Sequence, residues 1–85
     1  MERYKIEIRK SAAKEIEQLP SRDLKAVFAR IESLSENPRP HDCKKLSGQD
    51  KYRIRSGDYR ILYSIEDDLL VIYVVRVGHR KDVYR

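Results

Sequence analysis

Two strand-like runs joined by a two-residue turn constrain the fold of this chain most. Gly57 and Asp58 separate residues 52–56 from residues 59–66, and glycine at the first position of a two-residue loop is typical of a type II′ β-hairpin. Because successive side chains of a strand point to opposite faces, this hairpin has one apolar and one basic face. The apolar face, expected to cover the helices, holds Tyr52, Ile54, Ile61 and Tyr63, and the basic face, here called the arginine face, holds Arg53, Arg55 and Arg60.

The arginine face is unfavourable for stability in the predicted register. Arg55 lies directly opposite Arg60, and like charges opposite each other on adjacent strands destabilise a hairpin by up to ~1 kcal/mol. Shifting the register by two residues does not help, because Arg53 then faces Arg60. Guanidinium groups bind phosphates in bidentate fashion, so we interpret this face as a phosphate-binding surface. The alternative is an exposed sheet face on which long side chains splay apart.

Two short helices are predicted before the hairpin. Ser11 is a candidate N-cap for the first helix, which runs to about Leu19 and is stopped by Pro20, because proline cannot donate the next helix hydrogen bond. Ser21 is a candidate N-cap for the second helix, which is expected to end near residue 37. The short break between them predicts that the helices fold back on each other. Their apolar stripes comprise Ala12, Ile16 and Leu19 in the first and Leu24, Val27, Phe28, Ile31 and Leu34 in the second.

Two further strands complete the predicted sheet. Residues 3–9 alternate apolar with charged side chains, as a half-buried strand does. Residues 37–50 are expected to form a loop, and residues 69–77 form the most hydrophobic strand after a turn at Asp67 and Asp68. The order β-α-α-β-β-β predicts an α+β fold, with a largely antiparallel four-stranded sheet and an N-terminal helical hairpin packed on one face.

Length and composition limit the class of protein. The 85 residues are expected to form a single domain, residues 1–85. The one cysteine, Cys43, rules out an intramolecular disulfide and fits a reducing, cytoplasmic setting. The longest apolar stretch, residues 69–75, is too short to span a bilayer, so no membrane association is expected. His41, Cys43 and His79 lack metal-ligand spacing, so neither a metal nor another cofactor is expected.

Positive charge is concentrated in the second half of the chain. Residues 1–43 hold nine Lys or Arg and eight Asp or Glu, a balance of +1, whereas residues 44–85 hold ten and six, a balance of +4. A basic half favours a polyanionic partner, nucleic acid first. The alternative is an ordinary solvated surface.

The C-terminal segment carries groups suited to proton transfer and phosphate binding. Gly78 is expected to let the chain turn sharply away from the last strand. His79 is a candidate for proton transfer, the usual role of histidine in acid–base catalysis. Arg80 can stabilise charge that develops on a phosphorane, and Tyr84 can stack on a base or act as an acid or base. Without a metal site, a nuclease built from such groups acts on RNA, whose 2′-hydroxyl supplies the nucleophile. The alternative is a frayed polar tail.

Four segments of the second half together resemble a known family. In chain order they are Lys45-Leu46-Ser47-Gly48, Tyr52-Arg53-Ile54-Arg55, Gly57-Asp58-Tyr59-Arg60-Ile61-Leu62-Tyr63 and Val77-Gly78-His79-Arg80-Lys81-Asp82-Val83-Tyr84. No single segment is diagnostic, but their order and spacing are specific. On these segments the chain resembles the RelE/ParE toxin superfamily, and within it the RelE branch, over nearly its whole length.

The resemblance implies the toxin of a type II toxin–antitoxin pair. The implied activity is that of a ribosome-dependent mRNA endoribonuclease, which cleaves mRNA in the ribosomal A site by 2′-hydroxyl attack without a metal. The products are then a 2′,3′-cyclic phosphate and a 5′-hydroxyl. The implied partner is an acidic RelB-like antitoxin in a toxin–antitoxin hetero-oligomer, and the implied place of action is the cytoplasm.

The resemblance also implies roles for the individual residues that match positions of the family pattern. Arg60 and Arg80 are expected to contact and stabilise the scissile phosphate, and Tyr84 stands at the tyrosine proposed as general base. His79 neighbours this set, so the assignment of base and acid stays open. The expected catalytic residues are Arg60, Arg80, Tyr84, Arg55 and His79, and the expected RNA-binding residues are Arg53, Lys44, Lys45, Lys51 and Lys81.

The chain also departs from the family pattern. Ser47 sits where some members have arginine or glutamate, and no helix is expected after Tyr84, so inhibition is expected to come from covering the arginine face. Two other functions stay open. One is a ParE-like toxin that inhibits DNA gyrase and cuts nothing, and the other is an inactive homologue that binds RNA or antitoxin.

Overall fold

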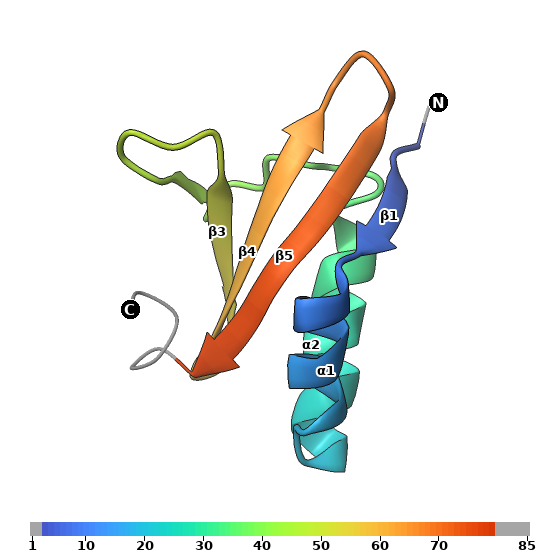
Figure 1. Cartoon of the computed structure of the whole chain (residues 1–85), viewed down its shortest axis with the longest axis vertical. Helices are drawn as coiled ribbons and strands as arrows, with labels where there is room; N and C mark the ends of the chain where they lie inside the picture. Colours follow the sequence, from blue (N-terminus) through green and yellow to red (C-terminus); the bar gives the residue numbers. More distant parts are fainter. Residues whose placement is uncertain (1–2, 80–85) are drawn as a thin grey trace.

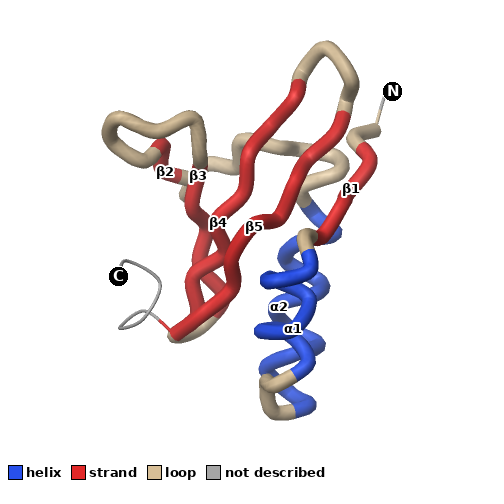
Figure 2. Tube along the Cα trace, in the orientation of Figure 1, coloured by secondary structure: helices blue, strands red, loops and turns tan. Residues whose placement is uncertain are grey.

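Two helices and five strands make up residues 3–79, the part of the chain that the computed structural model describes. In chain order they are β1 (Lys5–Ile8), α1 (Lys10–Glu17), α2 (Ser21–Ser33), β2 (Lys44–Lys45), β3 (Tyr52–Ser56), β4 (Tyr59–Glu66) and β5 (Val71–His79). Figure 2 shows the long connection between α2 and β3, which β2 interrupts only briefly. The predicted α+β succession is confirmed, with one short strand added.

All five strands form one sheet, in the order β1-β5-β4-β3-β2. β1 pairs with β5 in parallel, and the other neighbours pair antiparallel. The sheet has five strands rather than the predicted four because Lys44 and Lys45, expected in a loop, pair with Arg53 and Tyr52 along the edge of β3. Helices α1 and α2 lie side by side on one face of the sheet (Figure 1), as the predicted helical hairpin requires.

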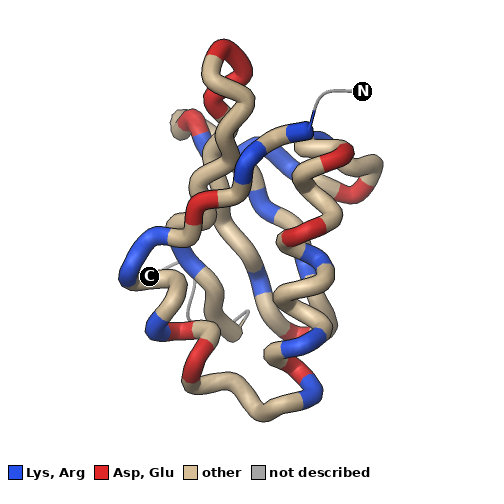
Figure 3. Tube along the Cα trace, turned by 90° about the vertical axis from the view of Figure 1, so that its right-hand side faces the viewer, with Lys and Arg blue, Asp and Glu red and all other residues tan. Residues whose placement is uncertain are grey.

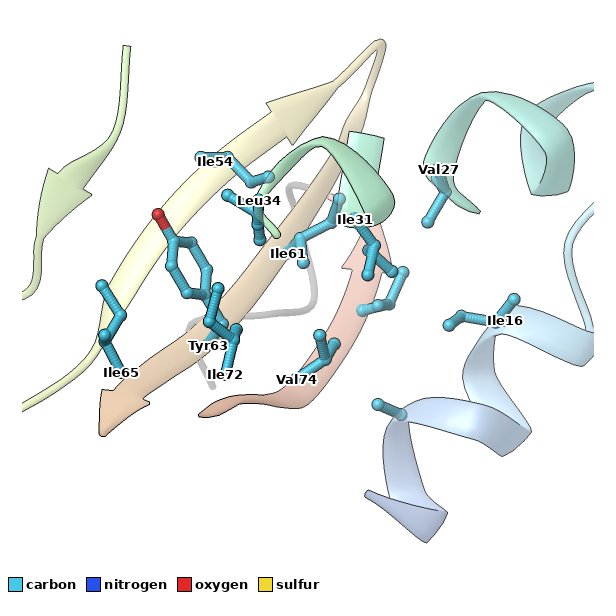
Figure 4. Packing of buried hydrophobic residues seen from close by; sticks show 12 residues of the cluster. Ile16, Val27, Ile31, Leu34, Ile54, Ile61, Tyr63, Ile65, Ile72 and Val74 are labelled. Carbon is cyan, nitrogen blue, oxygen red and sulfur yellow. The ribbon is translucent and has the colours of Figure 1, made fainter. Parts of the chain in front are cut away.

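The hydrophobic core lies between the helices and the sheet, and its side chains point toward one another from both layers (Figure 4). The helical stripes are confirmed except at Phe28, which is 43% exposed. Tyr63 is fully buried and its hydroxyl donates to the Pro38 carbonyl at 2.8 Å. Burial raises the pKa of Tyr63, so the hydroxyl stays protonated and keeps this bond even at pH values at which an exposed tyrosine ionises. The buried core comprises Ala12, Ile16, Val27, Ile31 and Leu34 from the helical layer and Ile54, Ile61, Tyr63, Ile65, Ile72, Val74 and Val77 from the sheet.

The first helix is capped differently from the prediction. The residue before α1 is Arg9, and no side chain caps the helix. The Arg9 N–H donates to the Val74 carbonyl at 2.9 Å, so strand pairing holds Arg9 extended, with φ −64° and ψ 154°. The predicted N-cap at Ser11 is wrong, because Ser11 already lies inside the helix and donates its hydroxyl to the Val75 carbonyl at 3.1 Å.

The second helix also begins one residue earlier than predicted. Pro20, not Ser21, precedes α2, and its carbonyl accepts the Leu24 N–H at 2.8 Å. Proline fixes φ near the value that a helix start needs, and no side chain caps this helix. The helix ends at Ser33 and a turn over residues 34–36 follows. Within residues 3–79, neither helix is long and apolar enough to cross a membrane.

Strand β5 begins and ends two residues later than predicted. Leu70 adopts a left-handed φ of +54°, and its N–H donates to the Asp67 carbonyl at 3.3 Å, so the turn after β4 extends to this residue. Gly78 does not turn the chain away from the sheet, because it lies within β5 and pairs with Arg60. The strand therefore reaches the level of the β3–β4 turn.

A β-bulge interrupts the pairing of β4 with β5. Tyr63 pairs with Val74, but its neighbour Leu62 pairs with Arg76, so Val75 is an extra residue on β5. An extra residue reverses which residues of the following segment face each side of the sheet. The core-facing residues of β5 are accordingly Ile72, Val74 and Val77.

Helix α1 covers the edge of β5 that β1 leaves open. β1 pairs with Val71 to Val74 only. Beyond this point Ser11 bonds the Val75 carbonyl, and a Glu15 carboxylate oxygen accepts the Val77 N–H at 2.8 Å. Glu15 also forms an ion pair with Arg76 at 3.0 Å. Side chains of α1 thus replace the missing strand and satisfy backbone groups that would otherwise form an open sheet edge.

Replacing Glu15 with alanine is expected to lower the free energy of unfolding by about 1–3 kcal/mol, because a buried backbone donor loses its partner. Val77 is 1% exposed, so water does not readily replace the carboxylate. Urea denaturation of purified protein measures this change. Glu17→Ala, on the exposed side of the same helix, is the matched control, and an equal loss in both variants would contradict the role of Glu15.

Arg39, in the connection between α2 and β2, is bound to the β4–β5 turn. This turn lies at the opposite end of β4 from the β3–β4 turn. Arg39 donates to both Asp67 carboxylate oxygens, at 2.9 and 3.3 Å, and its guanidinium lies 5.3 Å from the Tyr52 ring centre. The Tyr4 hydroxyl donates to the same carboxylate at 2.7 Å. Arg39 and then Tyr4 lower the pKa of Asp67. This network fastens the connection to the β4–β5 turn.

Candidate functional site

The β3–β4 hairpin has the register predicted from the sequence. Ser56 pairs with Tyr59 and Arg55 with Arg60. Gly57 has φ +59°, whereas Asp58 is not among the residues with positive φ. A left-handed first residue followed by an ordinary second one is the pattern of a type II′ turn. The turn therefore fixes two arginines directly opposite each other.

The two faces of the hairpin differ as predicted. Ile54 and Ile61 are fully buried against the helices, so the arginine face is turned away from them. Arg55 is exposed, and Arg53 and Arg60 are half-buried. Leu62, the cross-strand partner of Arg53, is only 7% exposed, as expected where long aliphatic stems lie along the sheet and carry charged ends outward.

A small hollow of about 70 Å³ lies at the turn end of the hairpin. Arg55, Gly57, Asp58, Tyr59 and Arg60 line it. On the other side of Arg60 the cross-strand neighbour is Gly78, which has no side chain to fill the space. The Arg55–Arg60 pair therefore borders this hollow, and a phosphate placed there would be within reach of both guanidinium groups.

The predicted RNA-binding lysines are placed unequally. Lys44 pairs with Arg53 and so shares the arginine face, whereas Lys45 pairs with Tyr52 on the side of the helices. Both lysines are exposed. Lys51 is half-buried and directly precedes β3, and its carbonyl accepts the Leu46 N–H at 2.9 Å. Of the three, Lys44 extends the basic surface most directly.

Basic positions occur on both helices as well as on the sheet (Figure 3). Several of these residues hold the fold together. Arg30 forms an ion pair with Asp42, and its Nε donates to the Arg55 carbonyl at 3.0 Å. Arg39 and Arg76 are bound to carboxylates as described above. Net charge alone does not mark the site, and the register of the hairpin is the more specific feature.

His79 lies on the other side of the sheet from the arginine face. It pairs with Tyr59, and the two rings meet edge to face with centroids 6.1 Å apart. The Tyr59 hydroxyl in turn donates to Asp23 of α2 at 3.2 Å. The structure therefore does not bring His79 together with Arg60, because the register places Gly78 opposite Arg60 instead. A catalytic role for His79 stays a prediction.

Arg80, Lys81 and Tyr84, the remaining predicted site residues, lie outside the described residues. The last described residue, His79, is paired beside the β3–β4 turn. The last described residue of β5 thus lies at the same end of the sheet as Arg55 and Arg60. Within residues 3–79, no three His, Cys, Asp or Glu side chains gather closely enough to hold a metal ion.

Comparison with known proteins identifies the family. A family model described as the ParE toxin of type II toxin–antitoxin systems, parDE, matches residues 6–84. The chain belongs to the RelE/ParE toxin family. The resemblance carried by the four sequence segments is thereby confirmed, and this RelE/ParE toxin is a toxin of the type II class.

Relatives of this RelE/ParE toxin carry RelE names. It is 33% identical over 87 residues to the putative toxin RelE1 of Methanocaldococcus jannaschii, covering 98% of this chain and 97% of that protein. It is 30% identical over 81 residues to the mRNA interferase toxin RelE of Escherichia coli, covering 92% and 84%. A chain in the crystal structure of the toxin–antitoxin complex RelBE2 from Mycobacterium tuberculosis matches with a TM-score of 0.81 and 31% identity, covering 92% of this chain and 99% of that one.

Proposed function

We propose that this RelE/ParE toxin is a ribosome-dependent mRNA endoribonuclease that works without a metal. The observation that carries the proposal is the like-charged pair Arg55 and Arg60, held in register beside the side-chain-free Gly78. A chain under selection for stability alone gains nothing from this pair. The name of the Escherichia coli relative, an mRNA interferase toxin at 30% identity, supports the same activity.

In the proposed reaction the nucleophile comes from the RNA. A base removes the proton of a 2′-hydroxyl, the 2′-oxygen attacks the adjacent phosphorus, and the bond to the 5′-oxygen breaks. An acid then gives a proton to that oxygen, which leaves a 2′,3′-cyclic phosphate and a 5′-hydroxyl. Arg60 and Arg80 stabilise the charge on the phosphorane, with Arg55 beside them. Tyr84 is the proposed base, and His79 is the alternative for one of the two proton transfers.

Substrate binding is assigned to basic residues around this pair. Arg53 and Lys44 continue the arginine face, and Lys45, Lys51 and Lys81 are assigned to more distant phosphates. Each contact with a single strand is expected to lower log K by about 0.7 per tenfold rise in salt concentration. Because ribosomes carry the proposed substrate, the cytoplasm is the proposed place of action.

The proposed inhibitor is a small acidic, RelB-like antitoxin that covers the arginine face in a hetero-oligomer. Complementary charge favours fast association of such a pair. Two solved structures support this partner: the RelBE2 complex described above, and the RelE–RelB complex of Pyrococcus horikoshii, in which a chain matches with a TM-score of 0.82.

Cleavage of mRNA in a translation extract tests the proposal. Wild-type protein is expected to cut ribosome-bound mRNA, and Arg80→Ala and Tyr84→Ala are each expected to be slower by a factor of about 100. Equal cleavage by all three proteins would contradict the site assignment. If no protein cleaves, the enzymatic proposal is wrong.

A second candidate function is inhibition of DNA gyrase, which is favoured by the ParE description of the matching family model. Supercoiling by purified gyrase in the presence of the toxin separates the two activities. Inhibition of supercoiling without mRNA cleavage would support the gyrase function. An inactive homologue would do neither and would not arrest growth when expressed alone.

A further inference from the structure

Three side chains from different elements meet behind the arginine face. Asp23 comes from the first turn of α2, Tyr59 is the first residue of β4, and His79 is the last residue of β5. The Tyr59 hydroxyl donates to an Asp23 carboxylate oxygen at 3.2 Å, and its ring meets the His79 ring edge to face at 6.1 Å. We refer to these residues as the Asp23–Tyr59–His79 cluster.

The cluster is adjacent in sequence to two proposed phosphate-binding residues. Tyr59 directly precedes Arg60, and His79 directly precedes Arg80. Because neighbours along a strand point to opposite faces, a side chain that fixes Tyr59 from the helix side also fixes the backbone from which Arg60 extends. The edge-to-face contact of Tyr59 with His79 likewise joins the start of β4 to the last described residue of β5.

Helix α2 contacts the hairpin at a second point. Arg30, two turns further along the helix, donates to the backbone carbonyl of Arg55 at 3.0 Å. A hollow of about 440 Å³ lies at the Asp23–Tyr59 contact, lined among others by Asp23, Ala26 and Tyr59. The side chains of helix and hairpin therefore leave space at this end, and the hydrogen bond from Tyr59 to Asp23 joins the two elements beside it.

Tyr59 is suited to a lasting contact of this kind. Its ring packs against the core, so it is partly withdrawn from water. Burial, together with the Asp23 carboxylate, raises the pKa of Tyr59. A tyrosine hydroxyl is already protonated at neutral pH, and the raised pKa keeps it a donor to Asp23 at more alkaline pH as well.

We propose that Asp23 and Tyr59 are positioning residues that fix the ends of β4 and β5 against α2 and so hold Arg60 in place. The inference rests on the proposed nuclease function, since Arg60 has to meet the scissile phosphate. Small displacements of groups that act together on a transition state are costly, at about 100-fold for a shift near 1 Å. Neither residue touches the RNA in this proposal.

Matched variants separate positioning from general stability. Tyr59→Phe removes the hydroxyl and keeps the ring against His79. Asp23→Asn and Asp23→Ala both remove the charge from the first turn of α2, but asparagine keeps an oxygen that accepts the hydrogen bond. Tyr4→Phe is the control, because it removes a similar bond to Asp67 at the far end of β4, about 23 Å away at 3.3 Å per residue.

The first readout is mRNA cleavage in a translation extract over a range of toxin concentrations. Tyr59→Phe and Asp23→Ala are expected to lower the rate at saturating toxin about tenfold, with little change in the half-saturating concentration. Asp23→Asn and Tyr4→Phe are expected to stay within about twofold of wild type. Wild-type rates for Tyr59→Phe, or an equal loss in Tyr4→Phe, would overturn the proposal.

The second readout does not depend on catalysis. Amide hydrogen exchange of residues 76–79 is expected to be about fivefold faster in Tyr59→Phe than in wild type, and unchanged in Tyr4→Phe. Unchanged exchange at this strand end would overturn the proposal even if cleavage were altered. If the wild-type protein cleaves no RNA, the proposed function fails, and the exchange rates alone decide whether the cluster holds β5 in place.

Discussion

Arg60→Ala is expected to slow mRNA cleavage by about 100-fold or more, the usual effect of removing one preorganised group that stabilises transition-state charge. The cross-strand neighbours of Arg60 are Arg55 on β3 and Gly78 on β5. It is therefore the residue best placed to reach a phosphate lying across the strands. Cleavage at saturating toxin in a translation extract measures the effect.

Two controls accompany this variant. Arg22→Ala removes an exposed arginine of α2 and is expected to cleave at the wild-type rate. The thermal unfolding temperature of Arg60→Ala is expected to equal that of wild type or to be slightly higher, because the repulsion between Arg55 and Arg60 is lost. A much lower unfolding temperature would show that Arg60 serves the fold, and normal RNA cleavage would show that it is not needed for the reaction.

Arg55→Glu is expected to change stability and activity in opposite directions. The new carboxylate lies directly opposite Arg60, so repulsion becomes attraction and the free energy of unfolding rises by up to ~1 kcal/mol. The same carboxylate competes with the phosphate for Arg60, and cleavage is expected to fall about 100-fold. Urea denaturation and the cleavage assay measure the two effects on one protein.

Lys25→Glu is the matched charge reversal for this experiment. It makes the same change of net charge on the exposed side of α2, away from the hairpin. Both its stability and its cleavage rate are expected to stay near those of wild type. Should Arg55→Glu destabilise the fold and leave cleavage intact, the arginine pair would have no functional meaning.

The hairpin was predictable because residues close together in the sequence determine its turn and its pairing. A glycine followed by aspartate between two strand-like runs fixes the turn, and the turn fixes the pairing, so all five pairs follow from counting. The helix starts were not predictable in this way. Arg9 is extended because its N–H pairs with Val74, 65 positions further along the chain, and no local pattern contains that contact. The short β2 likewise exists only through β3.

The candidate site was predictable to a similar extent. The arginine face was confirmed because it depends on the same local turn. The place of His79 was not, because it depends on the bulge at Val75, which shifts the last residues of β5 by one. Asp23 gave no functional signal in the sequence, since an acidic residue in the first turn of a helix is ordinary there. Only its contact with Tyr59 connects it to the site.

The bulge at Val75 lets the length of this stretch change by one residue without exchanging the faces of the strand. Deleting the extra residue would restore uninterrupted pairing with β4, and Arg76 and Val77 would stay opposite Leu62 and Ile61. Val77 would remain in the core, and His79 would stay opposite Tyr59. Homologous toxins that are one residue shorter here are therefore expected to keep the corresponding side chains on the same faces of the sheet.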